Sequence, residues 1–152
     1  MAKMGLSVRD DPPKVVDLTI RSWGEIEGGL VLSIADIARD DSEALPRISV
    51  LVRNVSQERQ DFVAPGWLFF FQVDVRLPDG AAQPLGPFGR GLLSPERRTE
   101  RIPVSLAPGE FYEMEIPIGS LFNLRANGRY DVTVSAEPVD GVRLLSNRIR
   151  IG

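Results

Sequence analysis

The sequence contains no cysteine and no histidine among its 152 residues. Without cysteine, the chain forms no disulfide, thiolate nucleophile, iron–sulfur cluster or cysteine-ligated zinc site. Without histidine, it lacks the commonest metal ligand and the base of the Ser-His-Asp and Cys-His hydrolases. These two absences exclude most of the common catalytic classes, and we expect no cofactor.

Long hydrophobic runs are also missing. The longest, residues 67–71, is far shorter than the roughly 20 apolar residues that span a bilayer, so no membrane span is predicted. The first twenty residues hold no apolar region of the kind found in signal peptides. We therefore expect either a cytoplasmic protein or a secreted or periplasmic one from which a signal peptide was removed.

The chain has no strong excess of positive charge. Its net charge is -3, so no overall field attracts nucleic acid, and we expect no nucleic-acid partner. Arginines concentrate in one stretch, where Glu96 and Glu100 interleave with them, and this mixture predicts surface ion pairs. The arginines of that stretch are Arg90, Arg97, Arg98 and Arg101.

What the sequence does have is alternation of apolar and polar residues with a period of two, which is typical of half-buried strands. No convincing helical stripe occurs. Short strands without βαβ spacing predict an antiparallel sandwich of two sheets. The alternating runs are 16–20, 30–34, 48–52, 67–77, 102–106, 112–118, 130–136 and 142–151.

The run 67–77 is the longest predicted strand. Its alternation directs Trp67, Phe69 and Phe71 inward and places Leu68 and Phe70 on the opposite face. A strand that is apolar on both faces is normally covered on both. Either the segment 15–37 or a second chain is expected to supply the second cover.

Residues 106–136 carry the most specific fold signals. Leu106-Ala-Pro-Gly-Glu110 predicts a tight hairpin, and residues 119–125 predict a helical turn that caps the core. Tyr130 then opens a strand after Gly128 and Arg129. In immunoglobulin-like sandwiches such a tyrosine bonds through its hydroxyl to the backbone of the preceding corner.

Several motifs between residues 47 and 151 occur together in one known class of module. They are a strand ending in Asn54, the Leu-x-Pro-Gly-Glu turn, the sequence Gly-x-Tyr-x-Val-x-Val over residues 128–134, and Ser146-Asn147 before a last alternating run. In these the chain resembles bacterial immunoglobulin-like and fibronectin-type-III-like modules. Their order is also similar to that of the intracellular proteinase inhibitor family of bacilli.

The predicted fold class is therefore all-β, an immunoglobulin-like antiparallel β-sandwich of 7–9 strands. We expect a flexible or extended N-terminal lead over residues 1–14, followed by a single domain over residues 15–152.

The segment 84–93 is unusually apolar for a loop. Its apolar side chains either pack over an open end of the core or form a protein-binding surface with Phe88 as the aromatic anchor and Arg90 beside it. The candidate partner-binding residues are Leu85, Phe88, Arg90 and Leu92, together with Leu68 and Phe70.

One acidic loop is a weak candidate for calcium, because calcium favours clustered carboxylate oxygens. Its spacing matches no EF-hand loop, so a solvated acidic loop is the preferred interpretation and no metal site is predicted. The residues are Asp36, Asp40, Asp41 and Glu43.

The leading hypothesis is a noncatalytic module or assembly subunit that binds another protein or copies of itself, as a monomer or an oligomer. A protease inhibitor, suggested by the resemblance, would present residues 89–91 or 94–95 as an extended loop. A carbohydrate-binding domain would stack sugars on Trp23, Trp67 or Tyr112. A carboxylate-pair hydrolase is disfavoured, because Glu113 and Glu115 share an exposed strand face without an evident cleft.

Overall fold

The computed structural model describes residues 21–39, 41, 44–64, 71–92, 102–139 and 141–152. The predicted lead and the predicted strand 16–20 lie outside these residues. The described part contains nine strands and two short helices. They are β1 (Leu30–Asp36), β2 (Ile48–Asn54), β3 (Gln60–Ala64), β4 (Phe71–Arg76), α1 (Pro87–Leu92), β5 (Ile102–Leu106), β6 (Phe111–Ile116), α2 (Ile118–Leu121), β7 (Tyr130–Val139), β8 (Val142–Leu145) and β9 (Ile149–Ile151).

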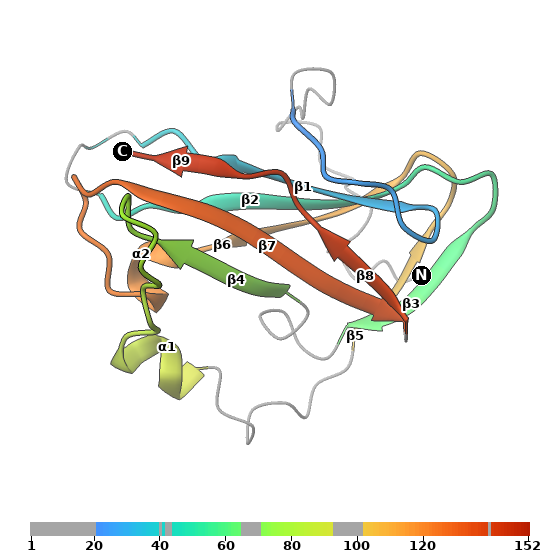
Figure 1. Ribbon diagram of the computed structural model, residues 1–152. Helices are drawn as coiled ribbons and strands as arrows, with labels where there is room; N and C mark the ends of the chain where they lie inside the picture. Colours follow the sequence, from blue (N-terminus) through green and yellow to red (C-terminus); the bar gives the residue numbers. More distant parts are fainter. Residues whose placement is uncertain (1–20, 40, 42–43, 65–70, 93–101, 140) are drawn as a thin grey trace.

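The strands form two larger sheets and a two-stranded ribbon. Strands β1, β2 and β6 make one antiparallel sheet, and β4 pairs with β7, which pairs along its other edge with β8 and β9. Strands β3 and β5 form the ribbon. Figure 1 shows the two larger sheets as separate layers. The prediction of an all-β antiparallel sandwich is confirmed.

The core lies between the layers and is built from the inward positions of each alternating run. Leu32 and Val50 of the first sheet and Val132 of the second are fully buried. The rings of Phe71 on β4 and Tyr112 on β6 stack with centroids 6.3 Å apart, which ties the two sheets together. The expected cap is present, since Leu121 and the following Phe122 and Leu124 are buried below the sheets.

The corner before β7 has the predicted tyrosine bond. The backbone N–H of Arg125 donates to the hydroxyl of Tyr130 at 3.0 Å. Tyr130 is itself buried, so this bond fixes the entry of the chain into the longest strand. The prediction for this residue is confirmed.

The predicted hairpin at residues 106–110 is a turn between two sheets. The N–H of Glu110 donates to Ala107 at 2.9 Å, and Gly109 has φ 88°, which is a type II geometry with Pro108 in the preceding position. However, β5 pairs with β3 and β6 pairs with β2. The expectation that the flanking strands pair with each other was wrong.

Asn54 gives a physical reason for this departure. Its side-chain N–H groups donate to Leu106 at 2.9 Å and to Glu58 at 2.7 Å, while its backbone bonds Gly109 and Glu110. The end of β5 is therefore bonded to a side chain and not to β6. The asparagine that closes β2 holds the turn, the ribbon and the first sheet at one point.

Other strands also differ from expectation. Strand β3 was not predicted, because the run from Gln60 to Ala64 is short and its alternation is weak. The described part of the strand predicted over 67–77 begins at Phe71, and residues 67–70 lie outside the described residues. Pro103, which has no N–H to donate, lies on β5, and this strand pairs only with β3 in the described part of the chain.

The centre of the outer face of the β1–β2–β6 sheet is buried, although the alternation in β2 is typical of a half-buried strand. Leu51 is 0% exposed, and Ser33 and Ser49 are also buried. The guanidinium of Arg21 lies over this face and donates to the hydroxyl of Ser33 at 3.0 Å and to the carbonyl of Ser49 at 3.2 Å. Alternation in β2 alone does not reveal this second cover.

The motif Ser146-Asn147 joins the edges of the two sheets. Ser146 bonds Val134 of β7 through both its backbone N–H and its hydroxyl. The amide of Asn147 accepts from the N–H of Ile34 on β1 at 2.9 Å and donates to its carbonyl at 3.1 Å. A side chain therefore takes the place of a neighbouring strand along this part of the β1 edge.

Candidate functional site

The apolar segment that was expected to be a loop contains helix α1. Residues 87–92 are helical even though two of the six are glycine. Pro87 is the first helical residue, a position where its fixed φ favours the helix and its missing N–H costs nothing. A hydrogen bond from the N–H of Gly86 to the carbonyl of Leu121, at 2.8 Å, attaches the start of α1 to the rest of the domain.

Gly89 explains why this helix lies so close to α2. It is buried, and a Cβ placed there would come within 2.3 Å of the carbonyl oxygen of Leu121. A Cβ on Gly91 would meet nothing within 4 Å. The first glycine thus permits close packing, whereas the second lies on the open side of the helix. Sequence reasoning treated both glycines as loop signals.

The four predicted partner-binding residues of this segment divide into two pairs. Leu85 and Leu92 are partly buried and pack against the hydrophobic core. Phe88 is 58% exposed, and Arg90 is also exposed. The packing interpretation therefore describes Leu85 and Leu92, while the binding role of Phe88 and Arg90 stays a prediction. We call Phe88 and Arg90, with the exposed side of α1, the α1 surface.

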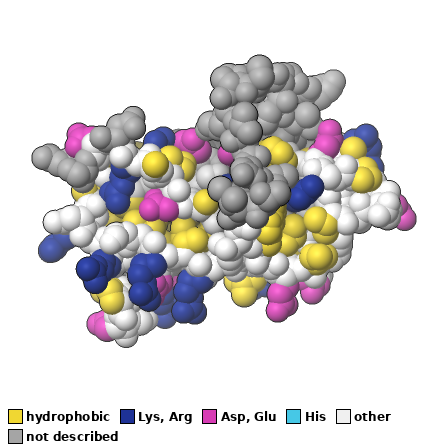
Figure 2. Space-filling model, turned by 90° about the horizontal axis from the view of Figure 1, so that it is seen from above, with side chains coloured by type: hydrophobic (Ala, Val, Ile, Leu, Met, Phe, Trp, Pro, Cys, Tyr) yellow, Lys and Arg dark blue, Asp and Glu magenta, His cyan; other side chains and the backbone are white. Residues whose placement is uncertain are grey.

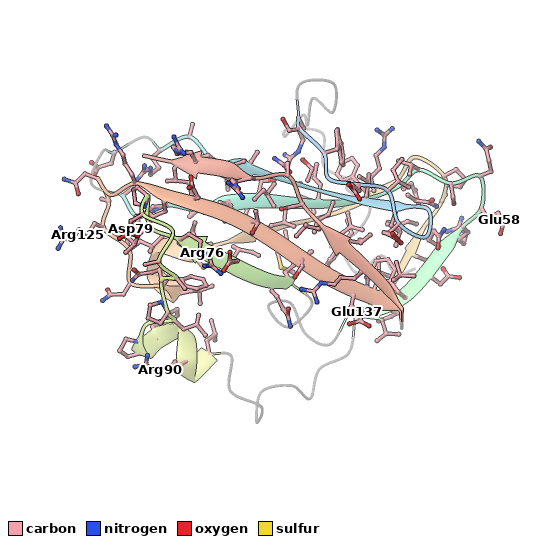
Figure 3. All side chains as sticks on the ribbon, viewed as in Figure 1. Glu58, Arg76, Asp79, Arg90, Arg125 and Glu137 are labelled. Atoms are coloured by element: carbon pink, nitrogen blue, oxygen red, sulfur yellow. The ribbon has the colours of Figure 1, made fainter. Side chains whose placement is uncertain are left out.

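Arg90 is held in position on this surface. Its guanidinium donates to the carbonyl of Leu85 at 2.6 Å, and its backbone N–H bonds the carbonyl of Gly86 at 2.9 Å. Figure 3 shows Arg90 on α1 at the lower left of the molecule, with Arg125 and Asp79 higher on the same side. Figure 2 shows the opposite side of the molecule, from above. The exposed phenylalanine therefore lies two positions before an arginine that is held by the backbone.

The second predicted surface cannot be placed, because Leu68 and Phe70 lie outside the described residues. In the part of that strand that is described, the predicted alternation is confirmed. Phe71 and Val75 are buried, while Gln72, Asp74 and Arg76 are exposed.

The acidic loop has only two of its four candidate residues in the described part. Asp36 is exposed at the end of β1, and partial burial raises its pKa, while Arg39 acts in the opposite direction. Arg39 also donates to the carbonyls of Ala44 and Ala126, which fastens the loop to the corner before β7. Among the described residues, no group of three or more acidic side chains could hold a metal ion. Asp40 and Glu43 lie outside them.

The structure describes two of the three aromatic residues that were proposed for sugar stacking. Tyr112 is 0% exposed, and burial raises its pKa to about 12. Trp23 is half-buried, and Trp67 lies outside the described residues. Tyr112 is therefore a core residue, and the assignment of a stacking role to it was wrong.

The paired glutamates of β6 differ from the expected exposed pair. Glu113 is half-buried and accepts from the hydroxyl of Ser49 at 3.3 Å, below Arg21. Glu115 is more exposed and pairs with Arg47 at 3.0 Å. Both carboxylates therefore contact neighbours on the outer face of the first sheet, and each contributes to that face.

The segment proposed as an extended inhibitory loop is helical where it is described. Residues 89–91 belong to α1, so they do not form an extended strand for a protease. The alternative positions 94–95 lie outside the described residues.

None of the helices in the described part of the chain is long and apolar enough to cross a bilayer. The chain matches no protein-family model, and no curated protein is significantly similar to it.

Proposed function

We propose that this chain is a noncatalytic β-sandwich module that binds another protein through the α1 surface. The observation that carries the proposal is the exposure of Phe88, 58%, on a helix that is fixed to the core on its other side. Large aromatic side chains are enriched among the residues that dominate binding energy at protein interfaces.

The attachment of α1 supports this role. Leu85 and Leu92 pack against the core, and Gly86 and Gly89 are held against Leu121. A surface that is already ordered before binding loses less conformational entropy on association. Phe88 is therefore presented by a rigid element, which favours recognition over a role in packing.

Arg90, two residues after Phe88 on α1, indicates the chemistry of the partner. Arg90 uses one guanidinium N–H for the carbonyl of Leu85 and retains other donors toward solvent. We infer a partner with an apolar pocket for the phenylalanine ring and carboxylate or carbonyl oxygens at its rim. Charge complementarity of this kind increases the association rate and the specificity.

The noncatalytic part of the proposal rests on residue chemistry. The sequence contains no histidine or cysteine, and both lysines lie within the first fourteen residues. The two glutamates of β6 bond to Ser49 and Arg47 on the outer face of the first sheet. Leu68 and Phe70 remain predicted members of the binding surface, and self-association through them remains a prediction.

The test is site-specific crosslinking in the native cell. A photoreactive phenylalanine analogue is placed at position 88 and, in a matched control, at position 26, where Ile26 is 63% exposed on a different surface. We expect one partner protein to crosslink in stoichiometric amount at position 88 and not at position 26. Equal crosslinking at both positions, or none at position 88, would contradict the proposal.

Two glycine variants examine whether the helix must stay in place. Gly89→Ala should displace α1, because its methyl group would meet the Leu121 carbonyl, and the crosslink from position 88 should be lost. Gly91→Ala has open space and should keep the crosslink. Melting temperatures identify any variant that fails to fold. A crosslink that survives Gly89→Ala with α1 displaced would argue against a preformed surface.

A further inference from the structure

The outer face of the sheet formed by β4, β7 and β8 has a groove of about 410 Å³ that the proposed function does not use. This volume is in the range of small-molecule sites, roughly 300–1,000 Å³. Figure 1 shows these three strands side by side, away from α1. The side chains that line the groove include Gln72, Asp74, Thr133, Ser135, Arg143 and Leu145.

The strand register places these side chains together. Gln72 on β4 lies opposite Ser135 on β7, and Ser135 lies opposite Leu145 on β8. In the next row Asp74 lies opposite Thr133. The groove is therefore lined by a carboxylate, an amide and two hydroxyls, with an apolar side chain on the β8 side.

Most of these polar groups are not used by the fold. Ser135 is only 8% exposed, yet its hydroxyl makes no hydrogen bond to any residue that the structure describes, and the same is true of the side chains of Gln72 and Thr133. The Ser135 hydroxyl oxygen is still reached by solvent, so a ligand would replace a bond to water with one of its own. This is an unusual arrangement in a protein whose other buried serines in the described residues are bonded, as Ser33, Ser49 and Ser146 are.

The two charged groups of the groove, Asp74 and Arg143, differ in whether the fold uses them. Asp74 is held by Arg76 at 3.1 Å, which fixes the carboxylate at the groove. Figure 3 shows Arg76 toward one end of this sheet and Glu137 toward the other. Arg143 is exposed and has no ion pair with any described residue. An arginine in this state can bind a carboxylate through two parallel N–H donors.

From these groups we propose that the groove binds an acidic saccharide, a sugar that carries a carboxylate. Arg143 would bind the carboxylate, and Asp74, an acceptor only, would bind sugar hydroxyls. Gln72, Thr133 and Ser135 can both donate and accept, as vicinal hydroxyls require. Leu145, which is 58% exposed, would contact the apolar face of the ring.

An extended peptide fits this site less well. Peptides that add to sheets bond to the backbone of an edge strand. Strand β7 at the centre of the groove is already paired with β4 on one side and β8 on the other. Only side chains are therefore available there, and they suit hydroxyls and a carboxylate better than a peptide backbone.

The experiment is an NMR titration of the full chain, labelled with ¹⁵N, with D-glucuronate and D-galacturonate. The matched probes are D-glucose, which lacks the carboxylate, and acetate, which lacks the hydroxyls. We expect at least one uronate to shift amide signals confined to β4, β7 and β8, with binding about tenfold weaker or absent for glucose and acetate. Two uronates without localised shifts, or acetate binding as tightly as the uronate, would overturn the proposal.

Three substitutions test which side chains contact the uronate. Arg143→Gln should weaken uronate binding about tenfold and Ser135→Ala severalfold, because each removes a direct bond. Arg150→Gln is the control, since Arg150 is an exposed arginine that pairs with Asp131 outside the groove lining. All three substitutions should keep the melting temperature. Unchanged uronate affinity in Arg143→Gln, or an equal loss in Arg150→Gln, would contradict the site.

Discussion

The outer faces of the two sheets use similar residues in opposite ways. On the β1–β2–β6 face, Leu51 is 0% exposed and Ser33 is bonded to Ser22 and Arg21. On the β4–β7–β8 face, Leu145 is 58% exposed and Ser135 has no bond to a described residue. The first face uses its central polar groups within the fold, whereas the second leaves the Ser135 hydroxyl without a bond to a described residue.

This difference shows how a sandwich can separate stability from recognition. A hydroxyl or guanidinium that is bonded within the fold stabilises it and is not available to a ligand. Arg21 makes four bonds to Ser33 and Ser49, whereas Arg143 makes none to the described residues. Composition alone does not distinguish these faces, since both contain Leu, Ser, Arg and acidic side chains.

The largest expected effect comes from a pair of leucines. Leu51→Ala should lower the free energy of unfolding by about 2–5 kcal/mol, because it leaves a cavity at a fully buried position. Leu145→Ala should change it by less than about 0.5 kcal/mol, because the side chain is already in water. Urea denaturation of both variants measures the difference. Similar losses in the two variants would show that both faces are covered.

A pair of arginines should give a smaller contrast. Arg21→Gln should cost about 1–3 kcal/mol, because it removes hydrogen bonds to Ser33 and Ser49 and leaves buried polar atoms without partners. Arg150→Gln breaks only an exposed ion pair with Asp131 and should cost less than about 1 kcal/mol. If urea denaturation gives Arg21→Gln the smaller loss, Arg21 does not hold the first face closed.

A substitution at the junction of the two sheets should cause a loss of stability of intermediate size. Asn147→Ala should cost about 1–2 kcal/mol, because the N–H and carbonyl of Ile34 lose their partly buried amide partner. It also uncovers the β1 edge, so self-association at high protein concentration should increase. Sedimentation velocity alongside urea denaturation measures both effects. A monomeric, fully stable variant would mean that Asn147 does not protect the edge.

The sequence was sufficient to predict features whose chemistry lies within a few residues. The Tyr130 bond to Arg125 and the turn at Pro108-Gly109 follow from local motifs, and the core positions of most strands follow from alternation. These features determine the fold class. The role of the candidate binding residues stays a prediction, for which the structure gives the exposure of Phe88.

The features that could not be predicted depend on contacts between distant segments. Helix α1 forms because Gly89 fits against Leu121, more than thirty residues away, whereas the local glycines indicate a loop. Leu51 is buried on a face over which the side chain of the distant Arg21 lies, and alternation does not encode this. The groove requires the register of three strands, so Gln72 and Ser135 carry no signal in the sequence that they lie side by side.

The smallest expected difference in stability compares one serine hydroxyl on each outer sheet face. Ser33→Ala should lower the free energy of unfolding by about 1 kcal/mol, because it removes a 2.6 Å bond to the carbonyl of Ser22 and an acceptor for Arg21. Ser135→Ala should be neutral or slightly stabilising, because the hydroxyl it removes has no partner in the described structure. Both serines are at least nine-tenths buried, so burial does not account for the contrast. Urea midpoints at equal protein concentration measure it, and an equal loss in both variants would mean that the Ser135 hydroxyl is already used by the fold and is not reserved for a ligand.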